Sequence, residues 1–395
     1  MSETDWLSRY RASLMGTITS PQALLARGEG CYVWDADGKK YLDFLAGIAV
    51  NSLGHAHPAL VAAVSNQIGT LAHVSNYFAS PPQIELAERL QRISGAGDSG
   101  RVFFCNSGTE AIEAALKLSR LNVAGGARPR ILALSHSFHG RTMGALSLTG
   151  QAALQDPFTP LIPGIEHLDS TVEALEQAIG PDVAALILEP IKGEAGVVEL
   201  PEDYLAKARE LTRKHGVLLI LDEIQTGIGR TGSWFAFQQF DIVPDAIVLA
   251  KGLAGGVPIG ALVTFGEAST LFQAGQHGST FGGNPLASAA GNAVLGEIER
   301  ASLVENAAKR GIELRELILG LGHPLIAEVR GRGLLLGVGL TKPVAKHMAD
   351  AALERGLIIN APNDYSIRIA PPLVVGDDEI AAFRELFTAT LEATS

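Results

Sequence analysis

Asp222 and Lys251 each follow directly on a short apolar run, where the strands of an open α/β sheet present groups to a ligand. Residues 217–221 precede Asp222, and residues 246–250 precede Lys251. A lysine at the end of a buried strand is partly desolvated, so its pKa falls and its amine becomes a usable nucleophile toward carbonyl groups. The plain alternative is that the acid caps the next turn and the lysine lies on the surface.

A second feature is the segment Asn106-Ser-Gly-Thr-Glu110, which follows the apolar run 101–105 and precedes a helical pattern. Free backbone N–H groups at such a helix start suit a phosphate group. A capping box formed by Ser107 and Glu110 would explain the same residues without any ligand. Gly108 favours the phosphate, because a residue without a side chain lets a ligand approach the backbone.

Together these features are what pyridoxal phosphate requires. The helix start at residues 106–110 would anchor its phosphate, Asp222 would pair with its ring nitrogen, and the amine of Lys251 would form a Schiff base. Phe138, in the segment His136-Ser-Phe-His-Gly-Arg141, could stack on a flat ring. The pair His136 and His139 could instead suggest zinc, but no third ligand cluster accompanies it, so we expect no metal. The pair His55 and His57 lies in a Gly/Pro loop, where we expect it to satisfy backbone hydrogen bonds.

The run Gly227-Ile-Gly-Arg-Thr-Gly232 matches the dinucleotide fingerprint G-x-G-x-x-G. Its context differs from that of a dehydrogenase, because the apolar run ends five residues earlier and no clean helix pattern opens at Gly232. A single match of this kind is weak evidence, so a dehydrogenase stays only a minor alternative.

The elements that must position these residues follow a clear pattern. Residues 31–34 and 40–44 predict a small antiparallel hairpin. From about residue 58, helices alternate with short apolar strands, which is typical of a mostly parallel sheet covered by helices. After residue 285 a long Ala-rich helix begins, and shorter strands then mix with helices. We expect an N-terminal segment with the hairpin (1–55) that belongs to a small domain, a large α/β domain (56–285) and a C-terminal α+β domain (286–395).

Seven runs in order resemble the class III (ornithine/4-aminobutyrate type) pyridoxal-phosphate aminotransferases over almost the whole chain. They are Gly54-His-Ala-His-Pro58, Asn106-Ser-Gly-Thr-Glu-Ala-Ile-Glu-Ala-Ala115, His136-Ser-Phe-His-Gly-Arg141, Glu189-Pro-Ile-Lys-Gly-Glu194, Leu221-Asp-Glu-Ile-Gln-Thr-Gly227, Lys251-Gly and Gly278-Ser-Thr-Phe-Gly-Gly-Asn-Pro285. The resemblance implies the type I fold of these transferases, with a mostly parallel seven-stranded sheet in the large domain and a smaller α+β domain. The chain departs from the family at Lys192, where glutamine is usual, and at Asn76-Tyr-Phe78.

The resemblance implies roles for individual residues. Lys251 would carry the cofactor and move the proton, Asp222 would keep the ring nitrogen protonated, and Gln225 would bind the phenolic oxygen. The implied cofactor-binding residues are Ser107, Gly108, Thr109, Phe138, His139, Asp222, Gln225, Lys251 and Thr280. In this family the position of Thr280 reaches the cofactor of a neighbouring subunit, which implies a homodimer.

The implied substrate-binding residues are Arg141, Glu194, Ser279 and Arg368. Arg141 would pair with the α-carboxylate of an acylated diamine, and Arg368 with that of glutamate or 2-oxoglutarate. The resemblance implies that Glu194 is a catalytic residue as well. It would pair with Arg368 when the ω-amino substrate is bound.

Three further runs resemble the family members that act on N-acetylornithine: Gly227-Ile-Gly-Arg-Thr-Gly232, Pro258-Ile-Gly-Ala261 and Ser279-Thr-Phe-Gly-Gly283. The expected reaction is transfer of the δ-amino group of N-acetylornithine to 2-oxoglutarate. Ornithine, succinylornithine, succinyldiaminopimelate and 4-aminobutyrate stay open as alternative amino donors. An aminomutase of the same fold is the nearest different class.

The overall composition excludes several other functions. With 31 basic and 42 acidic residues the net charge is −11, which opposes binding to nucleic acid or to anionic membranes. Two cysteines, Cys31 and Cys105, give no disulfide framework. The first residues show no apolar core of signal-peptide length, and no apolar run is long enough to span a bilayer. We expect a cytoplasmic enzyme.

Overall fold

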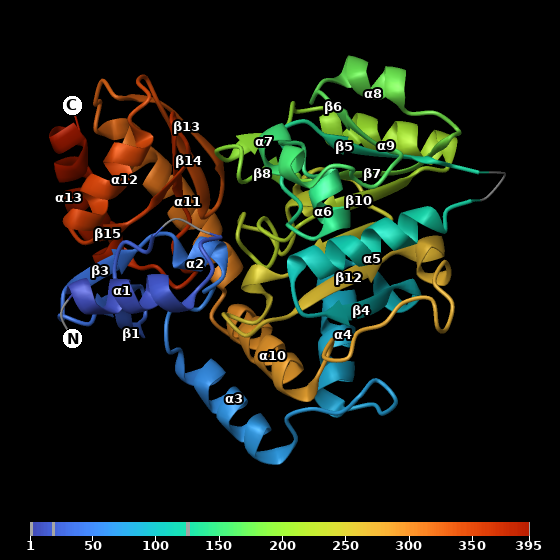
Figure 1. Ribbon diagram of the computed structural model, residues 1–395, viewed down its shortest axis with the longest axis horizontal. Helices are drawn as coiled ribbons and strands as arrows, with labels where there is room; N and C mark the ends of the chain where they lie inside the picture. The colour runs from blue at the N-terminus through green and yellow to red at the C-terminus, as the bar shows by residue number, and fades with distance from the viewer. Residues whose placement is uncertain (1–2, 18–19, 124–126, 395) are drawn as a thin grey trace.

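The computed structural model describes residues 3–17, 20–123 and 127–394, and its largest element is a seven-stranded sheet (Figure 1). The strand order is β4 (Arg101–Cys105), β12 (Gly260–Thr264), β11 (Ala246–Leu249), β10 (Leu218–Asp222), β7 (Val183–Leu188), β5 (Arg130–Leu134), β6 (Ile165–Leu168). β12 runs antiparallel to both of its neighbours, whereas the other pairs are parallel. The expected mostly parallel seven-stranded sheet is therefore confirmed.

Helices cover both faces of this sheet (Figure 1). On one face lie α5 (Gly108–Arg120) and α6 (Met143–Leu148), and on the other lie α4 (Pro81–Ser94), α8 (Val172–Ala178) and α9 (Tyr204–His215). The side chains of β10 alternate between the faces: Leu218 and Ile220 pack with α5 and α6, and Leu219 and Leu221 pack with α4 and α9. Because strand side chains alternate with a period of two, Asp222 continues the face that α5 covers.

A second sheet, in which all neighbouring strands are antiparallel, lies in the C-terminal part of the chain. Its order is β13 (Ile326–Arg332), β14 (Leu335–Leu340), β17 (Ser366–Ile369), β16 (Asn360–Asn363). Three helices belong to this part: α11 (Leu303–Gly320), α12 (Ala345–Glu354) and α13 (Asp377–Thr394). The mixture of helices and strands expected after residue 285 is present.

The N-terminal part begins with α1 (Glu3–Ser13) and contains the expected hairpin, β2 (Tyr32–Asp35) with β3 (Lys40–Asp43), to which β1 (Leu25–Glu29) adds a third strand. A fourth strand, β15 (Leu357–Ile358), comes from the C-terminal part and runs parallel to β3. Both ends of the chain therefore build one body, at the left of Figure 1. Residues 1–2 and 18–19 of the expected segment 1–55, and residue 395, lie outside the described residues.

The remaining elements connect these parts. They are α2 (Ala46–Ala49), α3 (Pro58–Thr70), α7 (Ala152–Gln155), the hairpin β8 (Ile191–Lys192) with β9 (Val198–Glu199), and α10 (Pro285–Arg300). α10 packs against α3 and α4. α3 projects from the lower edge of the molecule in Figure 1, and none of its thirteen described residues is buried. Among the helices of the described residues, none is long and apolar enough to cross a membrane.

Candidate active site

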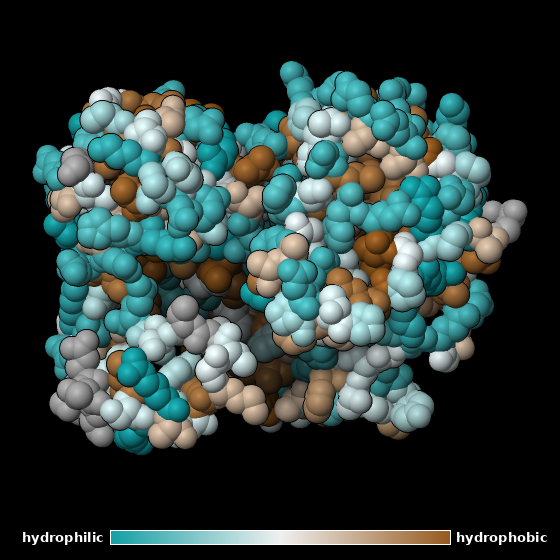
Figure 2. Space-filling model, turned by 45° about the horizontal axis from the view of Figure 1, so that its top comes forward, coloured by the Kyte–Doolittle hydropathy of each residue, from teal (hydrophilic) through white to brown (hydrophobic). Residues whose placement is uncertain are grey.

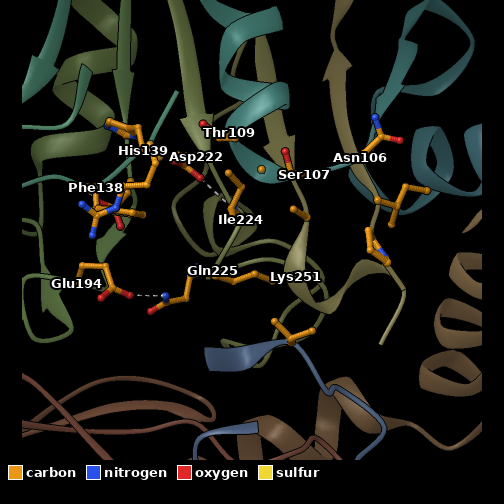
Figure 3. Close-up of a pocket in the computed structure, with 18 of the residues that line it drawn as sticks. Asn106, Ser107, Thr109, Phe138, His139, Glu194, Asp222, Ile224, Gln225 and Lys251 are labelled. Atoms are coloured by element: carbon orange, nitrogen blue, oxygen red, sulfur yellow. Dashed lines mark hydrogen bonds and ion pairs between the residues drawn. The ribbon is translucent and has the colours of Figure 1, made fainter. Parts of the chain in front are cut away.

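A cavity of about 380 Å³ opens at the carboxyl ends of the parallel strands. Ten of the residues singled out in the sequence line it: Ser107, Gly108, Thr109, Phe138, His139, Arg141, Glu194, Asp222, Gln225 and Lys251. Figure 3 shows labelled side chains from this group around one space, although they come from different strands and loops. Seen as a whole, the molecule is hollowed between its two halves (Figure 2).

The start of α5 forms one wall of the cavity. Ser107 is the N-cap, and its Oγ accepts a hydrogen bond of 3.3 Å from Glu110 N. The second bond of a capping box is absent from the described contacts, because the Glu110 carboxylate accepts from Asn106 N at 2.7 Å instead of from Ser107 N. The capping box, which was the ligand-free alternative for this segment, is therefore only half formed. The first N–H groups of a helix have no acceptor within it, so this wall can hold an anion.

The structure explains the glycine at position 108 by packing, which differs from the explanation expected from the sequence. A Cβ at this position would lie 2.7 Å from Cδ1 of Ile224, which also lines the cavity. Gly108 thus lets α5 approach the loop that follows Asp222, whereas the sequence argument expected it to admit a ligand. The Thr109 hydroxyl is paired with the Thr142 hydroxyl at 2.7 Å.

Asp222 and His139 form a buried pair beneath the cavity. Asp222 Oδ2 lies 2.7 Å from His139 Nδ1, and Asp222 Oδ1 accepts from Ile224 N at 3.1 Å. Burial lowers the pKa of His139, but the hydrogen bond to Asp222 and the charges of Asp222 and Glu189 outweigh burial, so the net shift of that pKa is upward. The Asp222 carboxylate therefore lies beside His139, whose raised pKa favours the positively charged form of the imidazole.

The adjacent acid, Glu223, turns away from the cavity. Its carboxylate accepts hydrogen bonds from the Thr226 hydroxyl and from the backbone N–H groups of Ala236 and Phe237. Burial raises the pKa of Glu223 to about 7. Glu223 thus caps a turn, which is the plain role considered for strand-end acids, and Asp222 alone of the two faces the site.

Lys251 begins a short 3₁₀ turn, separated from the end of β11 by Ala250 alone, and adopts a positive φ of 42°. Burial lowers the pKa of its amine, and this effect exceeds the opposing effect of the Glu194 charge. Among the described residues, none makes a hydrogen bond or an ion pair with Lys251 Nζ. A desolvated amine without a partner is suited to react with an aldehyde.

Phe138 and Arg141 lie on the loop after β5. The Arg141 guanidinium carbon lies 5.5 Å from the centroid of the Phe138 ring. Arg141 is exposed within the cavity, and it has no carboxylate partner within 4 Å among the described residues. Its charge is therefore available to an anionic substrate.

Glu189 is a cavity residue that the sequence reasoning missed. Its carboxylate accepts from Phe138 N at 2.9 Å and from Gly193 N at 3.1 Å, so it joins the loop of Phe138 to the loop of Glu194. Burial raises its pKa to about 7. The available signal was its position: it follows the buried strand β7 directly and opens the run Glu189-Pro-Ile-Lys-Gly-Glu194.

Arg368 reaches the same site from β17. It is 1% exposed, and its Nη1 donates to Glu194 Oε1 and, at 3.2 Å, to Gln225 Oε1. Gln225 Nε2 also donates to Glu194 Oε1 at 3.3 Å (Figure 3). Burial raises the pKa of Glu194, but the charge and hydrogen bond of Arg368 outweigh burial and hold that pKa below its usual range.

Ser279 and Thr280 lie outside the cavity lining. Ser279 Oγ accepts from Asn106 Nδ2 at 3.2 Å and from Gly282 N at 3.0 Å, whereas Thr280 is exposed. Lys192 is buried, and its Nζ donates to Ser135 O at 3.3 Å and to the Ser170 hydroxyl at 3.0 Å.

The two histidine pairs singled out in the sequence, His136 with His139 and His55 with His57, do not form a metal site among the described residues. His136 is exposed, and the described residues contain no group of three or more His, Cys, Asp or Glu that could hold a metal ion. His57 caps α3 by accepting from Ala59 N at 3.3 Å, as expected. The expectation for His55 was wrong, because its Nε2 pairs with the Asp43 carboxylate at 2.8 Å.

The donor set fits pyridoxal phosphate. The helix start suits its phosphate, the unpaired amine of Lys251 suits its aldehyde, the Asp222 carboxylate suits its ring nitrogen, and Phe138 offers an aromatic face. The fold and this donor set define the class of pyridoxal-phosphate-dependent transferases.

Comparison with known proteins identifies the family. The model described as "Aminotransferase class-III" matches residues 17–391. The chain is 50% identical over 385 residues to the acetylornithine aminotransferase of Streptomyces coelicolor, covering 97% of this chain and 94% of that protein. The chain belongs to the class-III aminotransferases, which use pyridoxal phosphate.

Two solved structures are similar over nearly the whole chain. The acetylornithine aminotransferase of Elizabethkingia anophelis has a TM-score of 0.88 at 34% identity, with 99% of each chain covered. The ornithine aminotransferase of Toxoplasma gondii, whose structure has partial occupancy of PLP at the active site, has a TM-score of 0.93 at 33% identity, covering 100% of this chain and 95% of that one.

Proposed function

We propose that this enzyme transfers the δ-amino group of N-acetylornithine to 2-oxoglutarate, giving N-acetylglutamate 5-semialdehyde and glutamate, a step of arginine biosynthesis. The observation that carries the proposal is the unequal state of the two arginines at the site. Arg141 is open to the cavity, whereas Arg368 is paired with Glu194. The high identity to acetylornithine aminotransferases supports the same assignment.

The two arginines would receive the two substrates in turn. Arg141 binds the α-carboxylate of N-acetylornithine, so that the δ-amino group at the other end reaches Lys251. Arg368 binds the α-carboxylate of glutamate or 2-oxoglutarate after Glu194 has moved away. A planar guanidinium suits both tasks because it pairs with a carboxylate through two hydrogen bonds. Ser279, held beside Asn106, is proposed to contact the substrate at the rim.

When bound, pyridoxal phosphate supplies an aldehyde that condenses with amines and a ring that withdraws electrons. Ser107, Gly108 and Thr109 hold the phosphate, Phe138 stacks on the ring, and Gln225 binds the phenolic oxygen. Asp222, itself positioned by His139, keeps the ring nitrogen protonated. Lys251 anchors the aldehyde and then moves the proton at the substrate carbon as a general acid and base.

We also propose a homodimer in which Thr280 contributes to the partner's site. The exposure of α3 supports it, because Val61 and Ile68 are 51% and 58% exposed on a helix with no buried residue among those described. Tyr77 and Phe281 are further exposed aromatic residues, at 92% and 59%. Apolar surface of this kind marks an interface.

For the domain organisation we propose the segments 1–55, 56–285 and 286–395, supported by the sheet that β3 and β15 share. We propose a cytoplasmic location, as for other biosynthetic enzymes of amino acids. The alternative amino donors are ornithine, succinylornithine, succinyldiaminopimelate and 4-aminobutyrate, and a reaction within one molecule would need no external acceptor.

The test is a product analysis with the purified holoenzyme. With N-acetylornithine and 2-oxoglutarate together, mass spectrometry should detect N-acetylglutamate 5-semialdehyde and glutamate in equal amounts. An aminomutase would instead consume the amine without 2-oxoglutarate.

A further inference from the structure

Arg230 is a buried arginine that the proposed reaction does not use. It belongs to the run Gly227-Ile-Gly-Arg-Thr-Gly232, which matches the dinucleotide fingerprint in sequence but opens no helix in the structure. Arg230 is 2% exposed, and no carboxylate among the described residues lies within 4 Å of its guanidinium. A buried charge without a counter-charge is costly unless hydrogen bonds compensate it.

The hydrogen bonds of Arg230 join two parts of the fold. Its Nη1 donates to Leu334 O, at 3.1 Å, and to Pro371 O. Its backbone carbonyl accepts from Leu334 N at 2.9 Å. Leu334 directly precedes β14, and Pro371 follows β17 by two residues, so one nitrogen holds the ends of two paired strands.

One of these two strands, β17, carries Arg368, the proposed binder of the dicarboxylate substrate. Arg368 lies on β17, opposite Gly337 of β14, and only three residues before Pro371. At about 3.3 Å per residue, the contact at Pro371 lies roughly 10 Å along the strand from Arg368. The contact at Pro371 is therefore close enough along the chain to influence where Arg368 is held.

The loop that carries Arg230 also touches Arg368 itself. Gln225, five residues before Arg230, accepts from Arg368 Nη1 at 3.2 Å. The backbone packs closely at the other end, because a Cβ on Gly333 would lie 2.4 Å from the carbonyl carbon of Thr231. The loop after Asp222 thus contacts this sheet in two places: Gln225 contacts the side chain of Arg368, and Arg230 contacts the ends of β14 and β17.

We propose that Arg230 is a positioning residue for the dicarboxylate substrate: by holding the ends of β14 and β17 it sets the place of Arg368 relative to the cavity. The inference rests on the proposed role of Arg368 as the binder of glutamate and 2-oxoglutarate. It predicts that Arg230 affects the dicarboxylate half-reaction and leaves the N-acetylornithine half-reaction nearly untouched.

The test compares Arg230→Met and Arg230→Lys with the matched variant Arg332→Met in the holoenzyme. Arg332 also joins the two parts of the fold, because its side chain donates to Glu199 and Gln239. It lies on β13, where its backbone pairs with Leu335, but among the described residues its side chain makes no hydrogen bond to Leu334 or Pro371. The measurements are KM for 2-oxoglutarate and for N-acetylornithine, and the dissociation constant of glutarate, an unreactive dicarboxylate, by calorimetry.

For Arg230→Met we expect KM for 2-oxoglutarate and the dissociation constant of glutarate to rise about tenfold, the effect of one misplaced charge-assisted bond. KM for N-acetylornithine should stay within about twofold, and Arg332→Met should leave the ratio of the two KM values unchanged. Arg230→Lys should weaken glutarate binding less, by about threefold, because one ammonium group can still reach a carbonyl. If the methionine variant does not fold, the lysine variant decides.

Unchanged glutarate binding in the Arg230 variants, equal rises of both KM values, or the same split in Arg332→Met would overturn the inference. Failure of the proposed function looks different, because wild-type enzyme would then not turn over N-acetylornithine. The glutarate measurement still tests Arg230 in that case.

Discussion

The carboxylate of Glu194 is paired with the guanidinium of Arg368, 174 residues further along the chain. Arg368 is buried, and its Nη2 has no hydrogen-bond partner among the described residues. A substrate carboxylate can bind this guanidinium with two parallel hydrogen bonds only when Glu194 has left it. In the proposed function, the pair therefore separates two states of the site, one for an ω-amine and one for a dicarboxylate.

Removing the side chain of Arg141 and removing that of Arg368 should impair opposite half-reactions. Arg141→Ala should impair the reaction with N-acetylornithine much more than the reaction with glutamate, and Arg368→Ala should do the reverse. Loss of one charge-assisted pair corresponds to roughly 1.5–3 kcal/mol, or about ten- to a hundredfold in specificity. The measurement is single-turnover loss of the cofactor absorbance with each donor. Equal losses for both donors would refute the division of roles.

Glu194→Gln should lower stability in a pH-dependent way. The pKa of Glu194 is held below its usual range, so its ionised form stabilises the fold above the ordinary pKa of a glutamate, and this contribution is lost as the pH falls through the lowered value. At pH 7 we expect a loss of roughly 1.5–3 kcal/mol that shrinks on acidification.

Thermal unfolding across a pH series measures this effect. Glu328→Gln is the matched control, because its carboxylate also pairs with an arginine, Arg330, but is 61% exposed. The control should change stability by less than about 1 kcal/mol. A difference between Glu194→Gln and wild type that does not depend on pH would contradict the assigned pairing.

Asp222→Asn should lower turnover by at least about a hundredfold, on the order of 3 kcal/mol of transition-state stabilisation. The shape is kept, but the charge beside the ring nitrogen is lost. Glu223→Gln is the matched control, since it changes the neighbouring acid, which turns away from the cavity. The control should retain most of its turnover, and near-normal turnover of Asp222→Asn would show that another group protonates the ring.

Borohydride reduction should label Lys251 and no other lysine. The reason is its unpaired, desolvated amine in the cavity, whereas the buried Lys192 has acceptors of its own. Peptide mapping of the reduced wild-type enzyme locates the label. Lys251→Ala should bind cofactor without covalent attachment, and a label on any other lysine would be incompatible with the assigned mechanism.

The parts of the site that follow buried strands could be predicted from the sequence. Asp222 and Lys251 follow the apolar runs of β10 and β11, and the period of two in β10 explains why Asp222 faces α5. The sequence of β6 does not show such a run, because Glu166 and His167 interrupt its apolar residues.

The pairing of Glu194 with Arg368 depends on packing between parts of the chain that are far apart, so spacing alone did not show it, and the resemblance to the family supplied it. Glu189 was missed for the same reason: its two partners, Phe138 N and Gly193 N, become neighbours only in the folded chain. The capping box was a local alternative to the phosphate site, and its second bond does not form, because the Glu110 carboxylate accepts from Asn106 N instead.

Charges on α3 should separate the proposed dimer. Val61→Asp with Ile68→Asp places two carboxylates on the exposed apolar face of α3, where burial in an interface would be costly. Ile312→Asp with Leu319→Asp is a matched control, because these residues are also seven positions apart and are 60% and 49% exposed on α11. Analytical ultracentrifugation should show monomers only for the α3 variant. A dimeric α3 variant would place the interface elsewhere.

The most direct test of the account is the ratio of kcat/KM for N-acetylornithine to that for 4-aminobutyrate, with 2-oxoglutarate as the acceptor. In the proposed binding mode, N-acetylornithine offers an α-carboxylate to Arg141 while its δ-amino group reaches Lys251, whereas the shorter 4-aminobutyrate cannot occupy both ends. We expect a preference for N-acetylornithine of at least about tenfold, which corresponds to roughly 1.4 kcal/mol. A preference for 4-aminobutyrate would contradict the assignment.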